Sequence, residues 1–158
     1  MSTQTDEKIY MTWERFDKDI DIFVEFITEQ KFIADSVILT LKRGAFPTAC
    51  KLSNKTGIPI SVVSYQTRDG NDEKPVFLEP DLIRNAKRII IPDDIYDTGK
   101  TVTDVITALI SGNADFNIGI NDILGLFHYG SDEIHNSILN NYKIITPNNG
   151  KWVVMPWE

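Results

Sequence analysis

The segment Asp93–Thr101 (Asp-Asp-Ile-Tyr-Asp-Thr-Gly-Lys-Thr) places three carboxylates and a glycine within nine residues. Two adjacent carboxylates suit a vicinal diol, such as the 2′ and 3′ hydroxyls of ribose, because they accept hydrogen bonds. One of them can also help to hold Mg²⁺, directly or through water. The turn from Thr98 to Thr101 leads into a helical pattern, so backbone N–H groups and the helix dipole would face a bound phosphate. These residue types together indicate a sugar-phosphate site.

The patterns on either side of this segment predict the elements that position it. The β-branched run from Ile89 to Ile91 favours a strand buried on both faces of a parallel sheet, with Asp93 and Asp94 at its carboxyl end. Apolar residues at helical spacing then predict a helix after the turn: Val102, Val105, Ile106, Leu109 and Ile110. The alternative is that the aspartates merely cap a turn and that the glycine merely ends it.

A P-loop is the obvious competing interpretation of Gly99-Lys100-Thr101. The P-loop pattern G-x-x-x-x-G-K-T requires its first glycine at position 94, where this chain has Asp94. A carboxylate there would repel the phosphates that a P-loop cradles. The P-loop interpretation is therefore excluded.

A second group with binding chemistry is Lys42-Arg43-Gly44. Two cations beside a glycine at the end of a strand can contact a pyrophosphate through their side chains and through backbone N–H groups of the turn. The alternative is a solvated basic strand end. The presence of the aspartate segment elsewhere in the chain favours pyrophosphate binding.

Alternating helical and strand patterns along the rest of the chain indicate an α/β sheet. Phe16, Ile20, Phe23 and Ile27 recur at helical spacing after the potential N-cap Thr12. The expected elements are a helix at 13–30, a strand at 37–41, a loop at 42–46, a helix at 47–55, a strand at 60–65, a mobile loop or hairpin tip at 66–74, and strands near 89, 123 and 144.

Composition favours a single domain, residues 1–158, with 42% hydrophobic residues for its core. The net charge of −7 disfavours a nucleic-acid-binding surface. Cys50 is the only cysteine, which excludes an intramolecular disulfide and a cysteine-based zinc site and fits a reducing cytoplasm. The first residues lack the apolar core of a signal peptide, and no apolar run approaches membrane-spanning length. We therefore expect a cytoplasmic protein with neither a nucleic-acid nor a membrane partner.

The segment Asp93–Thr101 resembles the phosphoribosyl pyrophosphate signature of the type I phosphoribosyltransferases. Within that family the chain is most similar to the short bacterial 6-oxopurine enzymes, the xanthine-guanine (hypoxanthine) phosphoribosyltransferases. Three further segments carry this resemblance: Thr12–Phe16 at the opening, Lys42–Gly44 at the pyrophosphate loop and Trp152–Glu158 at the purine-binding hood. The resemblance implies a type I phosphoribosyltransferase fold, with a central, mostly parallel sheet flanked by helices and a small hood formed by terminal segments.

The resemblance also implies an activity: transfer of 5-phosphoribose from phosphoribosyl pyrophosphate to hypoxanthine, guanine or xanthine, with Mg²⁺ as cofactor and pyrophosphate as the leaving group. By position in the motif, Asp97 is the expected catalytic residue, handling a proton at purine N7, and Asp94 is the expected metal ligand. The expected phosphoribosyl pyrophosphate-binding residues are Lys42, Arg43, Gly44, Asp93, Asp94, Asp97, Thr98, Gly99, Lys100 and Thr101. The expected base-binding residues are His128, Trp152 and Val153.

Three further expectations come from the same resemblance. The peptide between Lys42 and Arg43, which is often cis in the family, would be strained. The loop 66–74 could close over the site, and the protein would form a homodimer or homotetramer.

Base recognition leaves alternatives open. The family usually places a lysine where this chain has His128, and a neutral histidine donates only one hydrogen bond. His128 can equally be a strand residue whose hydrogen bonds are satisfied inside the protein. Without the resemblance, the segment around Trp152 would be interpreted as a buried edge strand. A phosphoribosyltransferase for another nucleobase, and a catalytically weak regulator that binds phosphoribosyl pyrophosphate, therefore both remain possible.

Overall fold

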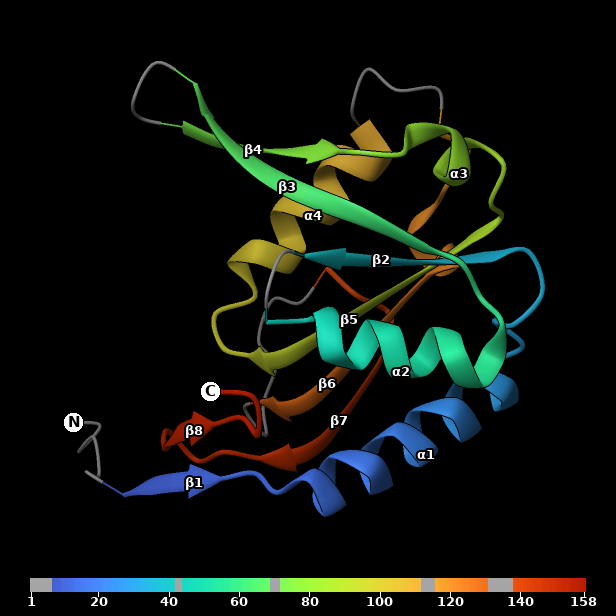
Figure 1. The fold of residues 1–158 in the computed structure, drawn as a ribbon. Coiled ribbons are helices and arrows are strands. Elements are labelled where there is room, and N and C mark those ends of the chain that lie inside the picture. The colour runs from blue at the N-terminus through green and yellow to red at the C-terminus, as the bar shows by residue number, and fades with distance from the viewer. Residues whose placement is uncertain (1–6, 42–43, 69–71, 112–115, 131–137) are drawn as a thin grey trace.

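A six-stranded sheet with helices on both faces forms the centre of the computed structural model, and a separate two-stranded sheet lies at one end (Figure 1). The structure describes residues 7–41, 44–68, 72–111, 116–130 and 138–158. Its strands are β1 (Lys8–Tyr10), β2 (Ser36–Leu41), β3 (Ile60–Arg68), β4 (Asp72–Phe77), β5 (Arg88–Tyr96), β6 (Ile123–Gly130), β7 (Asn141–Pro147) and β8 (Trp152–Val154). Its helices are α1 (Trp13–Glu29), α2 (Phe46–Thr56), α3 (Pro80–Arg84), α4 (Lys100–Ser111) and the 3₁₀ turn η1 (Ile120–Asp122).

The central sheet has the strand order β4-β3-β2-β5-β6-β7. All neighbouring pairs are parallel except β3 and β4, which form an antiparallel hairpin. Strands β2 and β6 are buried along their whole length, as expected for central strands covered on both faces. The carboxyl ends of the parallel strands share one edge of the sheet, which is where ligands bind in such folds.

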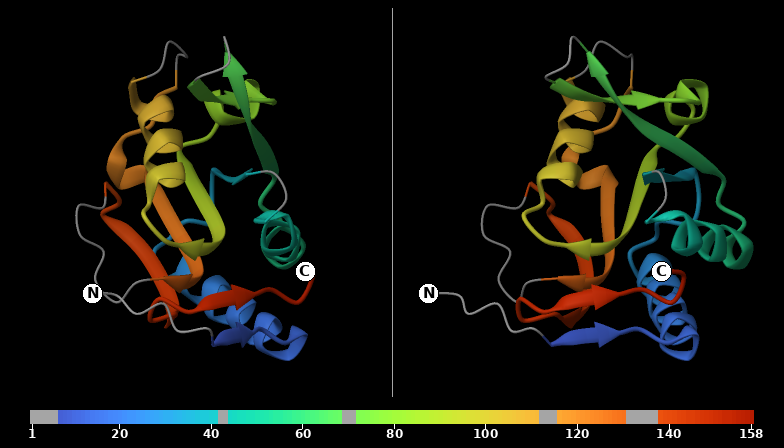
Figure 2. Two further views of the ribbon diagram at one scale, coloured as in Figure 1. Left: turned by 90° about the vertical axis from the view of Figure 1, so that its left-hand side faces the viewer. Right: turned by 60° about the vertical axis from the view of Figure 1, so that its left-hand side comes forward.

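Helices cover the two faces of this sheet, as the left view of Figure 2 shows. On one face, α1 and α2 pack against a core that includes Ile38 and Ile90. On the other face, α4 packs against a core that includes Ile89 and Phe127. Helix α1 starts at its N-cap Thr12, whose hydroxyl oxygen accepts the backbone N–H of Arg15 at 3.1 Å.

Strands β1 and β8 pair in parallel and form the two-stranded sheet, here called the hood. Val153 is buried and belongs to the same core as α1. In Figure 1 the hood lies below the edge at which β2 and β5 end. Terminal segments thus form a small hood beside a mostly parallel α/β sheet, which confirms the expected fold class.

Most expected elements agree with the structure to within one or two residues. The segment 66–74 belongs largely to the hairpin of β3 and β4, whose tip at 69–71 lies outside the described residues. The strand that carries the aspartates is longer than its apolar run from Ile89 to Ile91: β5 continues past Asp93 and Asp94 to Tyr96, because its pairing with β6 continues that far. Among the described helices, none has the length and apolar character needed to cross a membrane.

Candidate active site

The strand that carries the aspartates extends beyond one of its neighbours. Pairing of β5 with β2 reaches Ile90, whereas pairing with β6 continues to Tyr96. Among the described strands, the part of β5 that carries Asp93 and Asp94 is therefore paired with β6 alone. Helix α4 begins at Lys100, after a short turn, so the predicted order of strand, carboxylates, turn and helix is present.

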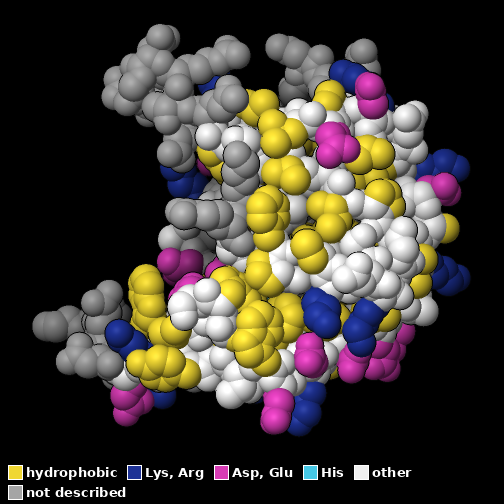
Figure 3. Space-filling view, in the orientation of Figure 1, with side chains coloured by type: hydrophobic (Ala, Val, Ile, Leu, Met, Phe, Trp, Pro, Cys, Tyr) yellow, Lys and Arg dark blue, Asp and Glu magenta, His cyan; other side chains and the backbone are white. Residues whose placement is uncertain are grey.

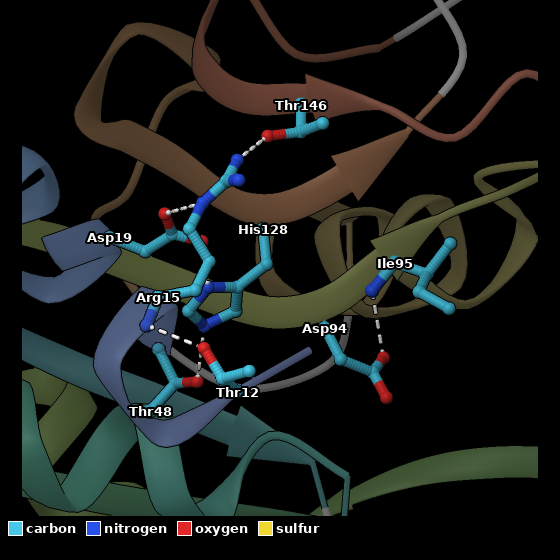
Figure 4. Close-up of polar contacts among 8 residues, drawn as sticks. All are labelled: Thr12, Arg15, Asp19, Thr48, Asp94, Ile95, His128 and Thr146. Carbon is cyan, nitrogen blue, oxygen red and sulfur yellow. Dashed lines mark hydrogen bonds and ion pairs between the residues drawn. The ribbon is translucent and has the colours of Figure 1, made fainter. Parts of the chain in front are cut away.

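The two adjacent aspartates are held by the backbone that follows each of them. The backbone N–H of Asp94 donates to Asp93 Oδ1 at 2.8 Å, and the N–H of Ile95 donates to Asp94 Oδ1 at 2.8 Å (Figure 4 shows the second bond). Loss of hydration raises the pKa of the Asp93 carboxyl well above its ordinary value, and the neighbouring Asp94 side chain raises it further through a hydrogen bond and its charge. Asp93 therefore keeps its proton to a higher pH than an exposed aspartate.

Gly44, after strand β2, closely approaches Asp94. A Cβ atom added to Gly44 would lie 3.2 Å from Asp94 Oδ2, so a side chain there would press on the carboxylate. This contact joins two of the predicted binding segments. Lys42, Arg43 and the peptide bond between them lie outside the described residues.

The turn before α4 requires glycine at position 99 for two reasons. Gly99 has a φ of +76°, and an added Cβ would overlap the Tyr96 hydroxyl oxygen. Thr98 Oγ1 accepts the backbone N–H of Lys100 at 3.3 Å, which is a capping contact at the start of α4. The Tyr65 hydroxyl donates to the carbonyl oxygen of Thr101 at 2.8 Å and ties the start of α4 to β3.

The side chains around this turn are open to solvent. Asp97, Thr98, Lys100 and Thr101 are all exposed, whereas Gly99 is buried. Exposed polar side chains beside a helix N-terminus leave room for a phosphate and its ribose. The site therefore presents its charged residues to an incoming ligand.

The carboxylates also fit the chemistry of Mg²⁺. In the described part of the chain, no group of three or more His, Cys, Asp or Glu side chains is placed to enclose a metal. Mg²⁺ keeps several waters and is usually held by one or two carboxylates together with substrate phosphates. Asp94, the expected metal ligand, is a carboxylate of the kind that this requirement calls for.

The structure places His128 inside the protein, on the side of the sheet covered by α1. Its ring is fully buried, with Nδ1 2.8 Å from Asp19 Oδ2 and Nε2 2.8 Å from Thr48 Oγ1 (Figure 4). The ring also stacks on Phe16 with centroids 5.4 Å apart. Because both nitrogens are occupied by buried partners, His128 matches the alternative of a satisfied strand residue. The expectation that it contacts the purine is therefore corrected.

Sequence reasoning missed the partners of His128. Asp19 is a carboxylate on the apolar face of α1, three residues after Phe16 and four before Phe23, and it is fully buried. A charged residue at such a position requires a polar partner, because an unpaired buried charge is costly. That signal was available in the helical pattern. The hydroxyl of Thr48 gives no comparable signal.

The hood presents Trp152 to solvent, with 69% of its surface exposed, while the side chain of Val153 is buried. Trp152 is therefore available for stacking, whereas Val153 could reach a ligand only through its backbone. Figure 3 shows a hollow on the left of the molecule, above hydrophobic side chains and bordered by acidic ones. The hollow lies on the side toward which β2 and β5 point in Figure 1.

Comparison with known proteins defines the class of this fold and site. The family model of the phosphoribosyl transferase domain matches residues 8–121. The chain therefore belongs to the phosphoribosyl transferase domain family.

Among solved structures, the purine phosphoribosyltransferase of Pyrococcus horikoshii is similar, with a TM-score of 0.67, 29% identity, and coverage of 98% of this chain and 95% of that one. The xanthine-guanine-hypoxanthine phosphoribosyltransferase of Helicobacter pylori has a TM-score of 0.73 at 15% identity, covers 96% of this chain and 94% of its own, and shows the shared fold. A hypoxanthine/guanine phosphoribosyltransferase of Methanosarcina mazei is 29% identical over 102 residues, 54% of this chain. That match spans 50% of the relative's own length.

Proposed function

We propose that this protein is a purine phosphoribosyltransferase. It transfers 5-phosphoribose from phosphoribosyl pyrophosphate to a 6-oxopurine (hypoxanthine, guanine or xanthine) and releases pyrophosphate. The observation that carries the proposal is the strand-turn-helix segment Asp93–Thr101, which lies within the family match at residues 8–121. The similar proteins named as purine or hypoxanthine/guanine phosphoribosyltransferases support a purine as the acceptor.

The proposed donor site divides its ligand among three groups of residues. Asp93 and Asp94 accept hydrogen bonds from the ribose hydroxyls, and Asp94 also binds Mg²⁺. The turn formed by Thr98, Gly99, Lys100 and Thr101 holds the phosphate of the sugar at the start of α4. Lys42, Arg43 and Gly44 hold the pyrophosphate, and the closeness of Gly44 to Asp94 supports a shared ligand.

Asp97 is the proposed catalytic residue. The transferred ribose develops positive charge while its bond to pyrophosphate breaks, so the purine must be held nearby and its N7 proton managed. Asp97 is exposed and lies between the diol-binding carboxylates and the phosphate turn. Its carboxylate is therefore suited to accept or hold that proton. Mg²⁺, when bound with the donor, would neutralise charge on the departing pyrophosphate.

The hood is the proposed base site. Trp152 offers an exposed aromatic face for stacking on a flat purine, and the backbone of Val153 offers hydrogen-bonding groups. His128 is not part of this proposal. We further propose that residues 1–158 act as one domain and that the enzyme works as a homodimer or homotetramer, as its family resemblance implies.

A base panel tests the proposal. The protein is incubated with phosphoribosyl pyrophosphate, Mg²⁺ and one base at a time, namely hypoxanthine, guanine, xanthine, adenine, uracil or orotate, and pyrophosphate release is measured. We expect release with at least one 6-oxopurine. Release with adenine or a pyrimidine alone would reassign the acceptor. Calorimetric binding of phosphoribosyl pyrophosphate without release for any base would instead support a regulator.

A further inference from the structure

A row of three buried polar side chains connects three elements beneath the site. Asp19 on α1, His128 on β6 and Thr48 on α2 are all fully buried. His128 lies 2.8 Å from each partner, through Nδ1 to Asp19 and through Nε2 to Thr48 (Figure 4). Since an ionised carboxylate only accepts hydrogen bonds, Nδ1 carries a proton, and in the neutral ring Nε2 accepts the Thr48 hydroxyl.

This order of carboxylate, imidazole and hydroxyl is also that of a nucleophilic triad. Here no substrate can reach the hydroxyl oxygen, because Thr48 has no exposed surface. The row therefore cannot act on a substrate directly. What it can do is fix the relative positions of the elements that it joins.

One end of the row lies close to the donor site. Thr48 is in the first turn of α2, which begins two residues after Gly44, and Gly44 approaches the Asp94 carboxylate. On the sheet, Phe127 and Tyr129 pair with Asp93 and Ile95, so His128 between them stands opposite Asp94. The imidazole thus links the strand next to Asp94 with the helix that follows Gly44.

The other end of the row is anchored toward the hood. Arg15 Nε donates to Asp19 Oδ1 at 3.1 Å, and its guanidinium also donates to the hydroxyl of Thr146 (Figure 4). Thr146 lies near the end of β7, the strand that precedes the hood strand β8. Asp19 is therefore held in place, and His128 is oriented from a fixed point.

We propose that His128 is a positioning residue for the donor site. Through Thr48 it holds the start of α2, and with it Gly44, at the distance from Asp94 that the diphosphate donor requires. The kinetic part of this inference rests on the proposed function, whereas the effect on α2 does not. Loss of the bond between His128 and Thr48 should weaken donor binding without altering the chemical step.

Two substitutions of one residue isolate that bond. Thr48→Val keeps the shape of the side chain and removes the hydroxyl, whereas Thr48→Ser keeps the hydroxyl. We expect Thr48→Val to raise the KM for phosphoribosyl pyrophosphate about tenfold, since small displacements of binding groups have large effects, with kcat changed less than about twofold. Thr48→Ser should restore a KM close to that of the wild type. Equal KM values for the three proteins, or a fall in kcat at unchanged KM, would overturn the proposal.

Amide hydrogen exchange gives a readout that needs no turnover. Exchange in residues 44–50 should be faster in Thr48→Val than in Thr48→Ser, while exchange in α4 stays the same in both. If Thr48→Val does not fold, His128→Asn replaces it, because asparagine can still donate to Asp19 but leaves Thr48 without its acceptor. Unchanged exchange in residues 44–50 would contradict the positioning role even if the wild type showed no transferase activity. Absence of wild-type turnover alone would count against the proposed function only.

Discussion

The Asp93 side chain on β5 is hydrogen-bonded to the residue that follows it: Asp93 Oδ1 accepts the backbone N–H of Asp94 at 2.8 Å. The loss of hydration at Asp93 and the neighbouring Asp94 side chain raise the pKa of the Asp93 carboxyl. Two adjacent carboxyl groups at a ligand-binding edge carry a stability cost that a ligand or a cation can offset. The arrangement therefore makes the empty site sensitive to pH.

The first prediction concerns that sensitivity. Because its pKa is raised, Asp93 stays protonated in the folded state over a pH range in which it is ionised in the unfolded state. This pH range extends from the ordinary aspartate pKa of 3.8 to the pKa of Asp93 in the folded protein. The contribution of Asp93 to the free energy of unfolding is fully present below this pH range. It is lost as the pH rises through the range. Asp93→Asn removes the effect, so its stability relative to the wild type should rise with pH by up to about 1.4 kcal/mol per pH unit.

Urea unfolding of both proteins between pH 4 and pH 7 measures this difference. Asp81→Asn on α3 provides a control, because it removes a carboxylate from a solvent-exposed position. A constant difference between Asp93→Asn and the wild type over this range would mean that the pKa of Asp93 is not raised.

The second prediction concerns Gly99. Gly99→Ala faces both a left-handed φ and the Tyr96 hydroxyl, so we expect it to destabilise the fold by about 2–4 kcal/mol and to weaken phosphoribosyl pyrophosphate binding. Gly57→Ala is the matched control, because Gly57 has a φ of +75° and no atom within 4 Å of an added Cβ. It should lose only the backbone contribution, about 1 kcal/mol. If Gly99→Ala and Gly57→Ala lost equal stability in thermal unfolding, the Tyr96 side chain would have moved to accommodate the new methyl group.

The third prediction compares two aspartates with equally short polar contacts. Asp19 is buried and 2.8 Å from His128, whereas Asp21 is exposed and 2.8 Å from Lys55. Asp19→Ala leaves His128 and Arg15 without their partner, which should cost about 2–5 kcal/mol. Asp21→Ala should leave the unfolding midpoint nearly unchanged, because exposed ion pairs contribute little. Similar losses in urea unfolding would contradict the structural importance of the buried row.

The sequence alone predicts the parts of this fold that local patterns specify. Phe16, Ile20, Phe23 and Ile27 define the buried face of α1, and the patterns around Asp93 define the strand and helix of the site. The length of β5 could not be read in this way, because pairing with β6 extends the strand through polar residues. The role of His128 depends on Asp19, which is 109 residues away in the chain. Contacts of that kind arise from tertiary packing rather than from local pattern.

The fourth prediction concerns Asp97. Asp97→Asn should lower kcat by about 10²–10⁴-fold, the usual contribution of a general acid or base, because the amide cannot accept the N7 proton. Binding of phosphoribosyl pyrophosphate, measured by calorimetry, should change far less. The exposed Asp81→Asn again serves as the control and should retain full turnover. Equal turnover in Asp97→Asn and the wild type would remove Asp97 from the catalytic role.

The proposed transfer is tested most directly by identifying its product. Chromatography with mass detection, applied to a reaction of the protein with phosphoribosyl pyrophosphate, Mg²⁺ and hypoxanthine, guanine or xanthine, would reveal a nucleoside 5′-monophosphate if the transfer occurs. We predict the monophosphate of at least one of these bases, formed in equal amount with pyrophosphate and strongly reduced in Asp97→Asn. Recovery of all three bases unchanged, with the wild-type protein folded and phosphoribosyl pyrophosphate bound, would contradict the proposed activity.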